Sequence, residues 1–252
     1  MPYGLPYMGS KSRFAKDFID ALPSGRRFID LFGGGAAMSH AAVLSGKYDE
    51  VIYSDVNPLT CEYVRQAVAG RFSSIRPRWI SREEFHALKG IDPYIRYIWS
   101  FGNAGGSYIF GRDVEEEKRA LFERLITGEI KSVPSTIEPL SRLSRAGALS
   151  GLPIRVACRS YKDYHYEKGD VVYLDPPYDG TECYVGTRDF NRAEFLDFAA
   201  SIPCYISEYN IDARRFRLYY ERETSTLMSS SSNSIRRTEK LYRSLYAPAE
   251  RI

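Results

Sequence analysis

The stretch RFIDLFGGGAAMSHAAVL, residues 27–44, decides the predicted fold. Its first six residues form a short apolar segment that is typical of a buried strand. Gly33, Gly34 and Gly35 interrupt that strand, and the run of small residues behind them favours a helix that packs closely on a sheet. A strand, a glycine turn and a helix in this order predict an α/β unit.

The same alternation continues along the chain on both sides of an interruption. Residues 10–21 and 57–68 have the apolar spacing of amphipathic helices, and EVIYSD is a second strand that ends at Asp55. Further strands are predicted at residues 171–175, 204–210 and 216–223. This rhythm predicts an α/β core with a mainly parallel sheet.

Helical patterns replace the alternation between residues 71 and 155. The longest of them has Asp113 as its expected N-cap and Gly128 as its expected end. We therefore predict a core of residues 1–70 and 156–252 and a mostly helical inserted domain of residues 71–155. Such an insertion commonly adds a recognition surface to a catalytic sheet.

Composition and charge narrow the possible classes of protein. The chain has 252 residues, of which 44% are hydrophobic and 27% charged, which is typical of a soluble globular protein. We expect neither a membrane partner nor export, because no apolar run approaches a membrane span and the first residues lack a signal-peptide core. The four cysteines form no CxxC pair and there are three histidines, so no metal site is expected.

The glycine turn and the acids around it favour a nucleoside ligand that carries positive charge. Asp55 can accept hydrogen bonds from both hydroxyls of a ribose. GGGAA does not fit the dinucleotide pattern G-x-G-x-x-G, and Asp30 would repel a pyrophosphate but attract an ammonium or a sulfonium. S-adenosylmethionine meets these conditions; a glycine turn without a ligand is the alternative.

The tetrapeptide DPPY, residues 175–178, predicts a receptor for an aromatic amine. Pro176 and Pro177 cannot donate to a sheet ladder and fix the backbone, which leaves the Pro176 carbonyl available to a ligand. Asp175 adds a carboxylate acceptor, and Tyr178 can stack on a planar heterocycle. Together they could orient the amine toward a methyl donor. A rigid strand exit with a core tyrosine is the structural alternative.

Together with PYMGSK, residues 6–11, these motifs resemble the Dam-like DNA adenine methyltransferases, the D12 class with a DPPY motif. PYMGSK resembles the family's N-terminal donor-binding segment, DLFGGG its glycine motif and SDVNP its ribose-binding motif. The resemblance implies a Rossmann-like methyltransferase core that uses S-adenosylmethionine and no metal. It implies catalytic roles for Asp175, Pro176, Pro177 and Tyr178. It implies donor-binding roles for Tyr7, Lys11, Asp30, Phe32, Gly33, Gly34, Asp55 and Asp175.

Two further segments are expected to meet double-stranded DNA. One is the glycine-rich aromatic loop of residues 100–111, for which a loop that only packs is the alternative. The other, residues 229–240, sits where the family has a DNA-proximal loop, and its arginines suit phosphate contacts. The residues expected to contact DNA are Asn103, Ser107, Tyr108, Arg112, Arg236 and Arg237.

The resemblance implies a site-specific enzyme that methylates the N6 amino group of an adenine extruded from the duplex. Methylation of the cytosine N4 amino group and a catalytically silent DNA-binding relative are the alternatives. The implied setting is the cytoplasm of a bacterial cell or of a phage-infected host, with a link to restriction–modification. The chain is expected to be a monomer or a weak dimer.

Overall fold

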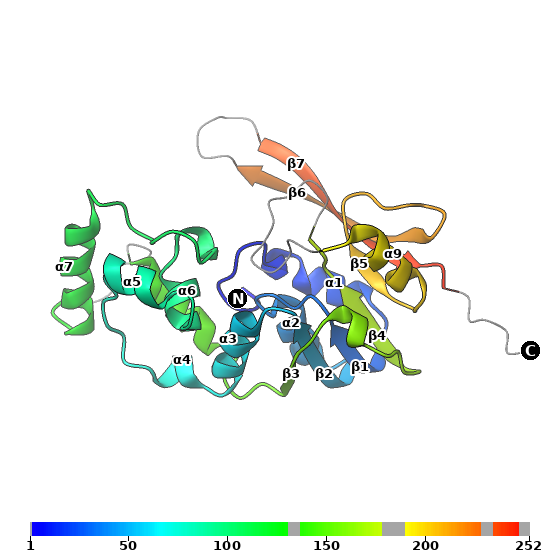
Figure 1. Cartoon of the computed structure of the whole chain (residues 1–252), viewed down its shortest axis with the longest axis horizontal. Coiled ribbons are helices and arrows are strands. Elements are labelled where there is room, and N and C mark those ends of the chain that lie inside the picture. Colours follow the sequence, from blue (N-terminus) through cyan, green and yellow to red (C-terminus); the bar gives the residue numbers. More distant parts are fainter. Residues whose placement is uncertain (1, 131–136, 178–189, 228–233, 247–252) are drawn as a thin grey trace, which may run out of the picture.

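The computed structural model describes residues 2–130, 137–177, 190–227 and 234–246. In these ranges a seven-stranded sheet of order β3-β2-β1-β4-β5-β7-β6 forms the centre of the chain (Figure 1). The strands are β1 Gly25–Asp30, β2 Tyr48–Asp55, β3 Ile154–Cys158, β4 Asp170–Leu174, β5 Tyr205–Ser207, β6 Phe216–Leu227 and β7 Ser234–Ser244. The first five are parallel, whereas β7 runs antiparallel to β5 and β6, so the sheet is mixed.

The described helices are α1 Ala15–Ala21, α2 Ala37–Ser45, α3 Pro58–Val68, α4 Arg71–Ser74, α5 Arg82–Leu88, α6 Pro93–Ile98, α7 Glu115–Ile126, α8 Glu138–Gly147 and α9 Arg192–Ala200. Short 3-10 turns occur at η1 Lys11–Arg13, η2 Phe101–Asn103 and η3 Tyr161–Asp163. The predicted α/β fold class is confirmed. Strand β3 was not predicted, and β7 includes residues that were expected to form a loop.

Side chains of successive strand residues face opposite sides of the sheet, and this alternation divides the core in two. Phe28 of β1 packs with Phe18 of α1 and Ala41 of α2 on one face. Its neighbour Ile29 packs with Phe195 of α9 on the other face. The sheet is therefore covered by helices on both sides, as its apolar strands require.

The order of the parallel strands reverses between β1 and β4. From β1 the chain proceeds outward through β2 and β3, whereas β4 and β5 extend from the opposite side of β1. Open α/β sheets bind ligands at such a switch point, in the crevice outside the carboxyl ends of the strands. The topology thus predicts a ligand site at the carboxyl ends of β1, β2 and β4.

The segment between α3 and β3 consists mainly of helices α4 to α8, which lie beside the sheet in Figure 1. Four aromatic rings, of Trp79, Trp99, Phe110 and Phe122, pack against one another with centroids 5.2 to 6.5 Å apart. The N-cap residue of α7 is Val114, so the expected cap at Asp113 is wrong. The expected helix end is confirmed, since Gly128 follows α7 with a φ of 77°.

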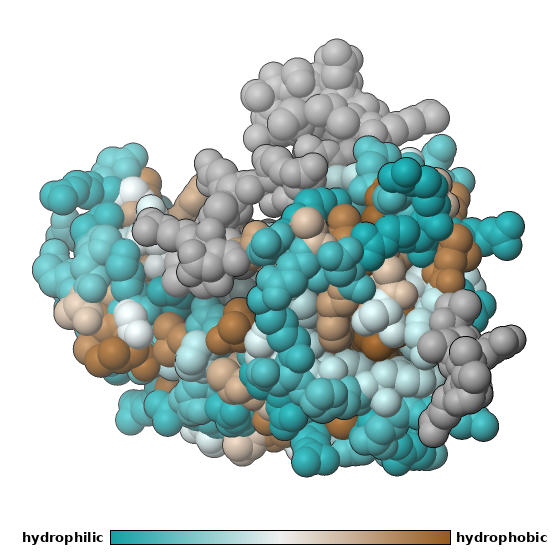
Figure 2. Space-filling model, turned by 45° about the vertical axis from the view of Figure 1, so that its right-hand side comes forward, coloured by the Kyte–Doolittle hydropathy of each residue, from teal (hydrophilic) through white to brown (hydrophobic). Residues whose placement is uncertain are grey.

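Strands β6 and β7 form a long hairpin that projects from the body of the protein (Figure 1). Its base is held to α1, because Arg222 forms an ion pair with Asp17 and the Tyr219 hydroxyl donates to the Ala21 carbonyl at 2.9 Å. Hydrophilic side chains cover most of the face seen in Figure 2. In the described part of the chain, every helix is too short or too polar to cross a bilayer.

Candidate active site

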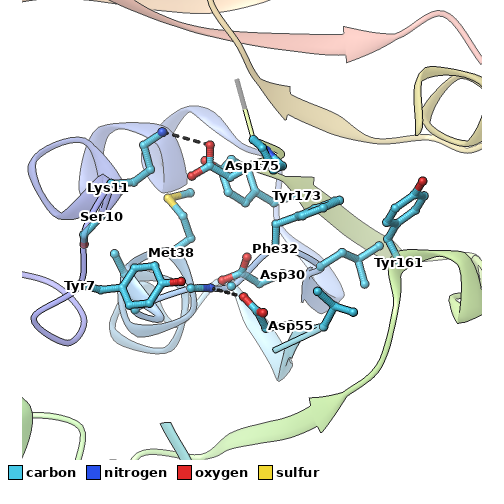
Figure 3. A pocket seen from close by; sticks show the side chains of 18 of the residues that line it. Tyr7, Ser10, Lys11, Asp30, Phe32, Met38, Asp55, Tyr161, Tyr173 and Asp175 are labelled. Atoms are coloured by element: carbon cyan, nitrogen blue, oxygen red, sulfur yellow. Dashed lines mark hydrogen bonds and ion pairs between the residues drawn. The ribbon is translucent and has the colours of Figure 1, made fainter. Parts of the chain in front are cut away.

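A cavity of about 680 Å³ opens at the switch point of the sheet (Figure 3). Asp30 ends β1, Asp55 ends β2 and Asp175 follows β4, and all three carboxylates line this cavity. The volume is in the range of sites for drug-sized ligands, roughly 300–1,000 Å³. Three acids that are far apart in sequence thus meet at one place because their strands are parallel neighbours.

Backbone amides orient both oxygens of the Asp55 carboxylate. The Gly34 amide donates to Oδ2 at 3.0 Å, and the Asn57 amide donates to Oδ1 at 2.8 Å. Burial raises the pKa of Asp55, although these hydrogen bonds act in the opposite direction. A carboxylate held in this way is a preorganised acceptor, which suits a ligand that brings hydroxyl groups.

Asp30 is the most deeply buried acid of the cavity, with 1% of its surface exposed. The Ser39 hydroxyl of α2 donates to its Oδ2 at 2.7 Å. Burial raises the pKa of Asp30 to about 7, the Ser39 hydrogen bond lowers it, and repulsion from Asp175 and Asp55 adds to the rise. A cationic group in the cavity would favour the ionised form of this acid.

The glycine turn brings the backbone close to the cavity. A Cβ atom on Gly33 would lie 2.2 Å from the ring of Tyr53, whose hydroxyl donates to the Gly34 carbonyl at 2.9 Å. Gly34 has a φ of 45°, and Gly35 lies against the Cβ atom of Tyr7. Packing against two tyrosines therefore explains why residues without side chains are needed here.

An ion pair joins the N-terminal segment to the DPPY motif. Lys11 Nζ lies 3.0 Å from Asp175 Oδ1, and the two side chains are 11% and 17% exposed (Figure 3). Burial alone would lower the pKa of Lys11, but attraction to Asp175 and to Glu239 raises it. Lys11 is thus charged at neutral pH and stabilises the ionised form of the acids near it.

Apolar side chains form part of the remaining wall of the cavity. The rings of Phe32 and Tyr161 stack with centroids 5.3 Å apart, and both lie on the side of the cavity away from Lys11 (Figure 3). Val56, which follows Asp55, also lines the cavity and is 55% exposed. An apolar surface beside the Asp55 carboxylate suits a planar ring that is linked to a ribose.

Eight residues were expected to bind the donor, and all of them line this cavity: Tyr7, Lys11, Asp30, Phe32, Gly33, Gly34, Asp55 and Asp175. Pro177 of the DPPY motif lines it too, whereas Pro176 is buried and lies outside the described lining. Tyr178 lies outside the described residues.

Sequence reasoning missed several residues of the cavity. Ser10 and Tyr161 line it, as do Tyr209 and Glu239. Ser10 belongs to the PYMGSK motif, so its position could have been inferred with that of Lys11. Glu239 lies within the segment that was expected to be a basic DNA-proximal loop, and no local pattern in the sequence indicates that it reaches the cavity.

The expected DNA-contacting residues do not line the cavity, and they differ in exposure. Ser107 and Arg112 are exposed. Asn103 is half-buried, has a φ of 58° and donates its side-chain amide to the Tyr97 carbonyl at 2.8 Å.

The expectation for Tyr108 is wrong, because this side chain is only 5% exposed and cannot reach DNA from the loop surface. Its hydroxyl donates to the Ile80 carbonyl at 2.7 Å, and its ring contacts those of Phe85 and Trp99. Tyr108 therefore packs the loop onto the helical segment.

Arg236 and Arg237 lie on a strand, where a loop was expected. In β7 they are paired with Ser225 and Thr224 of β6. Both residues thus belong to the hairpin that projects from the body of the protein (Figure 1).

Comparison with known proteins finds a family model that matches the first part of the chain. Residues 7–87 match the D12 class of N6 adenine-specific DNA methyltransferases, which confirms the resemblance over this range. The matched range includes PYMGSK, the glycine turn and Asp55. A search of curated proteins found no match.

Several solved structures are similar to the chain at low sequence identity. PH1948 from Pyrococcus horikoshii, a candidate RNA methyltransferase, is 14% identical with a TM-score of 0.41, over 94% of this chain and 86% of that one. The rRNA methyltransferase aviRa from Streptomyces viridochromogenes is 17% identical with a TM-score of 0.38, over 92% and 84%. An rRNA methylase from Streptococcus thermophilus is 11% identical with a TM-score of 0.33, over 94% and 98%.

Proposed function

We propose that the chain is a site-specific DNA methyltransferase that transfers a methyl group from S-adenosylmethionine to the N6 amino group of an adenine extruded from the duplex. The main support is the meeting of Asp30, Asp55 and Asp175 around one cavity at the switch point of the sheet. The match of residues 7–87 to the D12 class favours adenine as the target.

The residues on the β1–β2 side of the cavity fit S-adenosylmethionine. Asp55 would accept the ribose hydroxyls, because backbone amides already hold its carboxylate in place. Asp30 would face a positive group of the donor, whose charge would favour the ionised form of this buried acid. Phe32, Tyr161 and Val56 would contact the adenine ring of the donor. When bound, the donor supplies a methyl group on a positively charged sulfur.

The residues on the β4 side would hold the target base. Asp175 would accept one N–H of the amine and the Pro176 carbonyl the other, while Pro177 keeps this backbone rigid and Tyr178 stacks on the base. The positive charge of Lys11, 3.0 Å from Asp175, would favour the carboxylate form, which is the stronger acceptor. Transfer would form the bond from nitrogen to the methyl carbon as the carbon–sulfur bond breaks. The bonding electron pair would stay on sulfur, which becomes a neutral thioether, and the methylated amine would release one proton to solvent.

DNA would contact residues outside the cavity. We assign target recognition to residues 71–155, in which Asn103 and Ser107 lie on a loop closed by the Ser100–Tyr108 bridge and Arg112 follows that loop. Arg236 and Arg237 of the β6–β7 hairpin would contact phosphates, which position the enzyme without reading sequence. Extrusion of the adenine is required because a stacked base cannot present its amine to the donor.

A methyl-transfer assay tests the proposal. The purified chain is incubated with radiolabelled S-adenosylmethionine and DNA from a host without methylation, and the nucleosides are identified by mass spectrometry. We expect N6-methyladenine at one short sequence, found by sequencing the modified positions. Asp175→Ala should abolish the label, whereas Asp49→Ala, at an exposed position of β2, should retain it.

Two other results of this assay would change or overturn the proposal. Detection of N4-methylcytosine would show that the target base is cytosine and not adenine. Binding of DNA and donor without any methyl transfer would identify a catalytically silent relative and overturn the proposal.

A further inference from the structure

A fourth carboxylate, that of Glu239 on β7, lines the cavity and has no part in the reaction proposed above. The side chain is only 7% exposed. Its Oε1 accepts a long hydrogen bond of 3.4 Å from the Tyr209 hydroxyl. Within the described residues, Oε2 has no hydrogen-bond donor. A buried acceptor without a donor is unfavourable, so it is expected to gain one at some stage of the reaction.

The strand order places Glu239 on the same face of the sheet as Asp175. Tyr173 and Leu241 belong to one core cluster, and each lies two residues along its strand from one of the two acids. Because strand side chains alternate, Asp175 and Glu239 share the face of Tyr173 and Leu241. The same face is covered by α1, which directly follows the η1 turn that carries Lys11.

Lys11 interacts with both acids. It forms the 3.0 Å ion pair with Asp175, and attraction to Glu239 also contributes to the raised pKa of the lysine. A lysine ammonium has three donors on a flexible four-carbon stem, so it can turn from one carboxylate to another without movement of the backbone.

The ion pair between Lys11 and Asp175 would compete with docking of the target amine. A carboxylate oxygen that accepts from an ammonium is a weaker acceptor for a second donor. When the amine of the base docks on Asp175, the lysine therefore competes with it for Oδ1. Glu239 offers Lys11 a second acceptor in the same cavity.

We propose that Glu239 is a positioning residue that acts through Lys11. When the amine of the extruded base docks on Asp175, the Lys11 ammonium turns to Oε2 of Glu239, which has no donor among the described residues, and Oδ1 of Asp175 is then available to the amine. The negative charge of Glu239 attracts the lysine and keeps it in the cavity. This inference rests on the proposed methyl transfer.

A double-mutant cycle on the full chain tests whether Glu239 acts through Lys11. Single-turnover methyl transfer is measured for Glu239→Gln, Lys11→Met and the double variant, with DNA from an unmethylated host. We expect Glu239→Gln to slow the transfer about 10-fold, as for removal of a charged hydrogen bond. The double variant should be within about 3-fold of Lys11→Met, because two residues that act as one unit are not additive.

A matched control is Glu208→Gln. Glu208 is 3% exposed, like Glu239, but its carboxylate pairs with Arg192 at 2.9 Å and lies outside the cavity lining. This variant should transfer methyl groups at the rate of the wild type. Donor affinity measured by calorimetry should be unchanged in Glu239→Gln, because the residue lies on the target side. If the double variant were slower than Lys11→Met by the full factor seen in Glu239→Gln, the two residues would act independently and the proposal would be overturned.

A second measurement needs neither donor nor DNA. The rate at which acetic anhydride labels the Lys11 amine is followed by mass spectrometry near pH 9. Glu239→Gln should speed the labelling several-fold, because removal of the neighbouring negative charge makes the neutral amine more abundant. Glu208→Gln should leave it unchanged. Equal labelling rates in the wild type, Glu239→Gln and Glu208→Gln would overturn the link between Glu239 and Lys11. Absence of methyl transfer by the wild type would instead overturn the proposed function.

Discussion

Lys11 and Asp175 come from distant parts of the chain and form a buried ion pair of 3.0 Å across the cavity (Figure 3). Lys11 lies in η1, before the first strand, and Asp175 follows β4 at the centre of the sheet. The pair therefore connects the N-terminal motif to the DPPY motif. It also brings a positive charge to the acidic side of the cavity where the target amine is proposed to bind.

Removal of this positive charge should make methyl transfer depend more strongly on pH. In Lys11→Met, Asp175 loses the ammonium 3.0 Å away, a positive charge that favours the ionised form of a carboxylate. Single-turnover rates measured from pH 6 to pH 9 should therefore fall most at the acidic end. Lys16→Met is the control, because Lys16 lies on α1 and pairs with Asp20 at the surface. A decrease in rate that is equal at every pH would contradict this role of Lys11.

The sequence was informative about the acids of the site because each of them ends a recognisable strand. Asp30, Asp55 and Asp175 could be predicted from the motif that contains each acid, and the parallel sheet then brings them together. Glu239 could not be predicted in this way. It reaches the cavity only because β7 pairs antiparallel with β5, a long-range contact that has no local signature.

Burial explains the other differences between expectation and structure. Tyr108 lies in a glycine-rich loop of the kind that often contacts ligands, yet its ring fills a gap beside Trp99 and Phe85. The choice between packing and DNA contact depends on residues far away in the sequence. The segment around Arg236 was expected to be a loop because it sits where the resembled family has one, but pairing with β6 makes it a strand.

Substitution of Asp55 should chiefly weaken donor binding. Asp55→Asn removes a charged acceptor for the ribose hydroxyls, and a hydrogen bond to a charged group contributes about 1.5–3 kcal/mol. Calorimetry with S-adenosylmethionine should show a decrease in binding free energy of this size. Asp49→Asn changes an exposed acid of the same strand and should bind normally. An unchanged affinity in Asp55→Asn would exclude this residue as the ribose ligand.

The raised pKa of Asp30 should make donor binding depend on pH. Because burial raises this pKa to about 7, the acid is mostly protonated at pH 6 and mostly ionised at pH 8. A cationic donor group prefers the ionised form, so affinity should rise with pH, by up to about 10-fold per pH unit below pH 7. In Asp30→Asn this rise should disappear. Calorimetry at pH 6, 7 and 8 measures both proteins, and equal pH dependence would contradict the assignment.

The same acid should limit the stability of the unliganded chain. The pKa of Asp30 is about 7 in the folded chain, above its ordinary value of 3.8. Its favourable contribution to the free energy of unfolding is therefore complete below pH 4 and is lost as the pH rises through about 7. Asp30→Asn keeps an acceptor for Ser39 and removes the buried charge. At pH 8 it should be more stable than the wild type by up to roughly 4 kcal/mol, and at pH 4 the difference should vanish. Urea unfolding at the two pH values measures this; a constant difference would contradict it.

The residues proposed to contact DNA should separate into two groups by their response to salt. Phosphate contacts carry no sequence information, so replacement of Arg236 and Arg237 by alanine should weaken binding to target and non-target duplexes alike. It should also flatten the dependence of affinity on salt, by about 0.9 in the log–log slope for each phosphate that is no longer neutralised. Arg214→Ala is the control, because this side chain is 90% exposed and lies before the hairpin.

The loop of residues 100–111 and Arg112 should affect sequence preference instead. Ser107→Ala and Arg112→Ala remove exposed polar groups, and removal of one hydrogen bond to a base should reduce the preference for the cognate site by about 1–3 kcal/mol. Tyr108→Phe is the matched control in this loop, because its ring is buried and only the hydrogen bond to the Ile80 carbonyl is removed. The measurement is a salt titration of every variant on cognate and scrambled duplexes. If the arginine pair altered sequence preference and the loop variants altered only the salt slope, the two roles would be the reverse of those proposed.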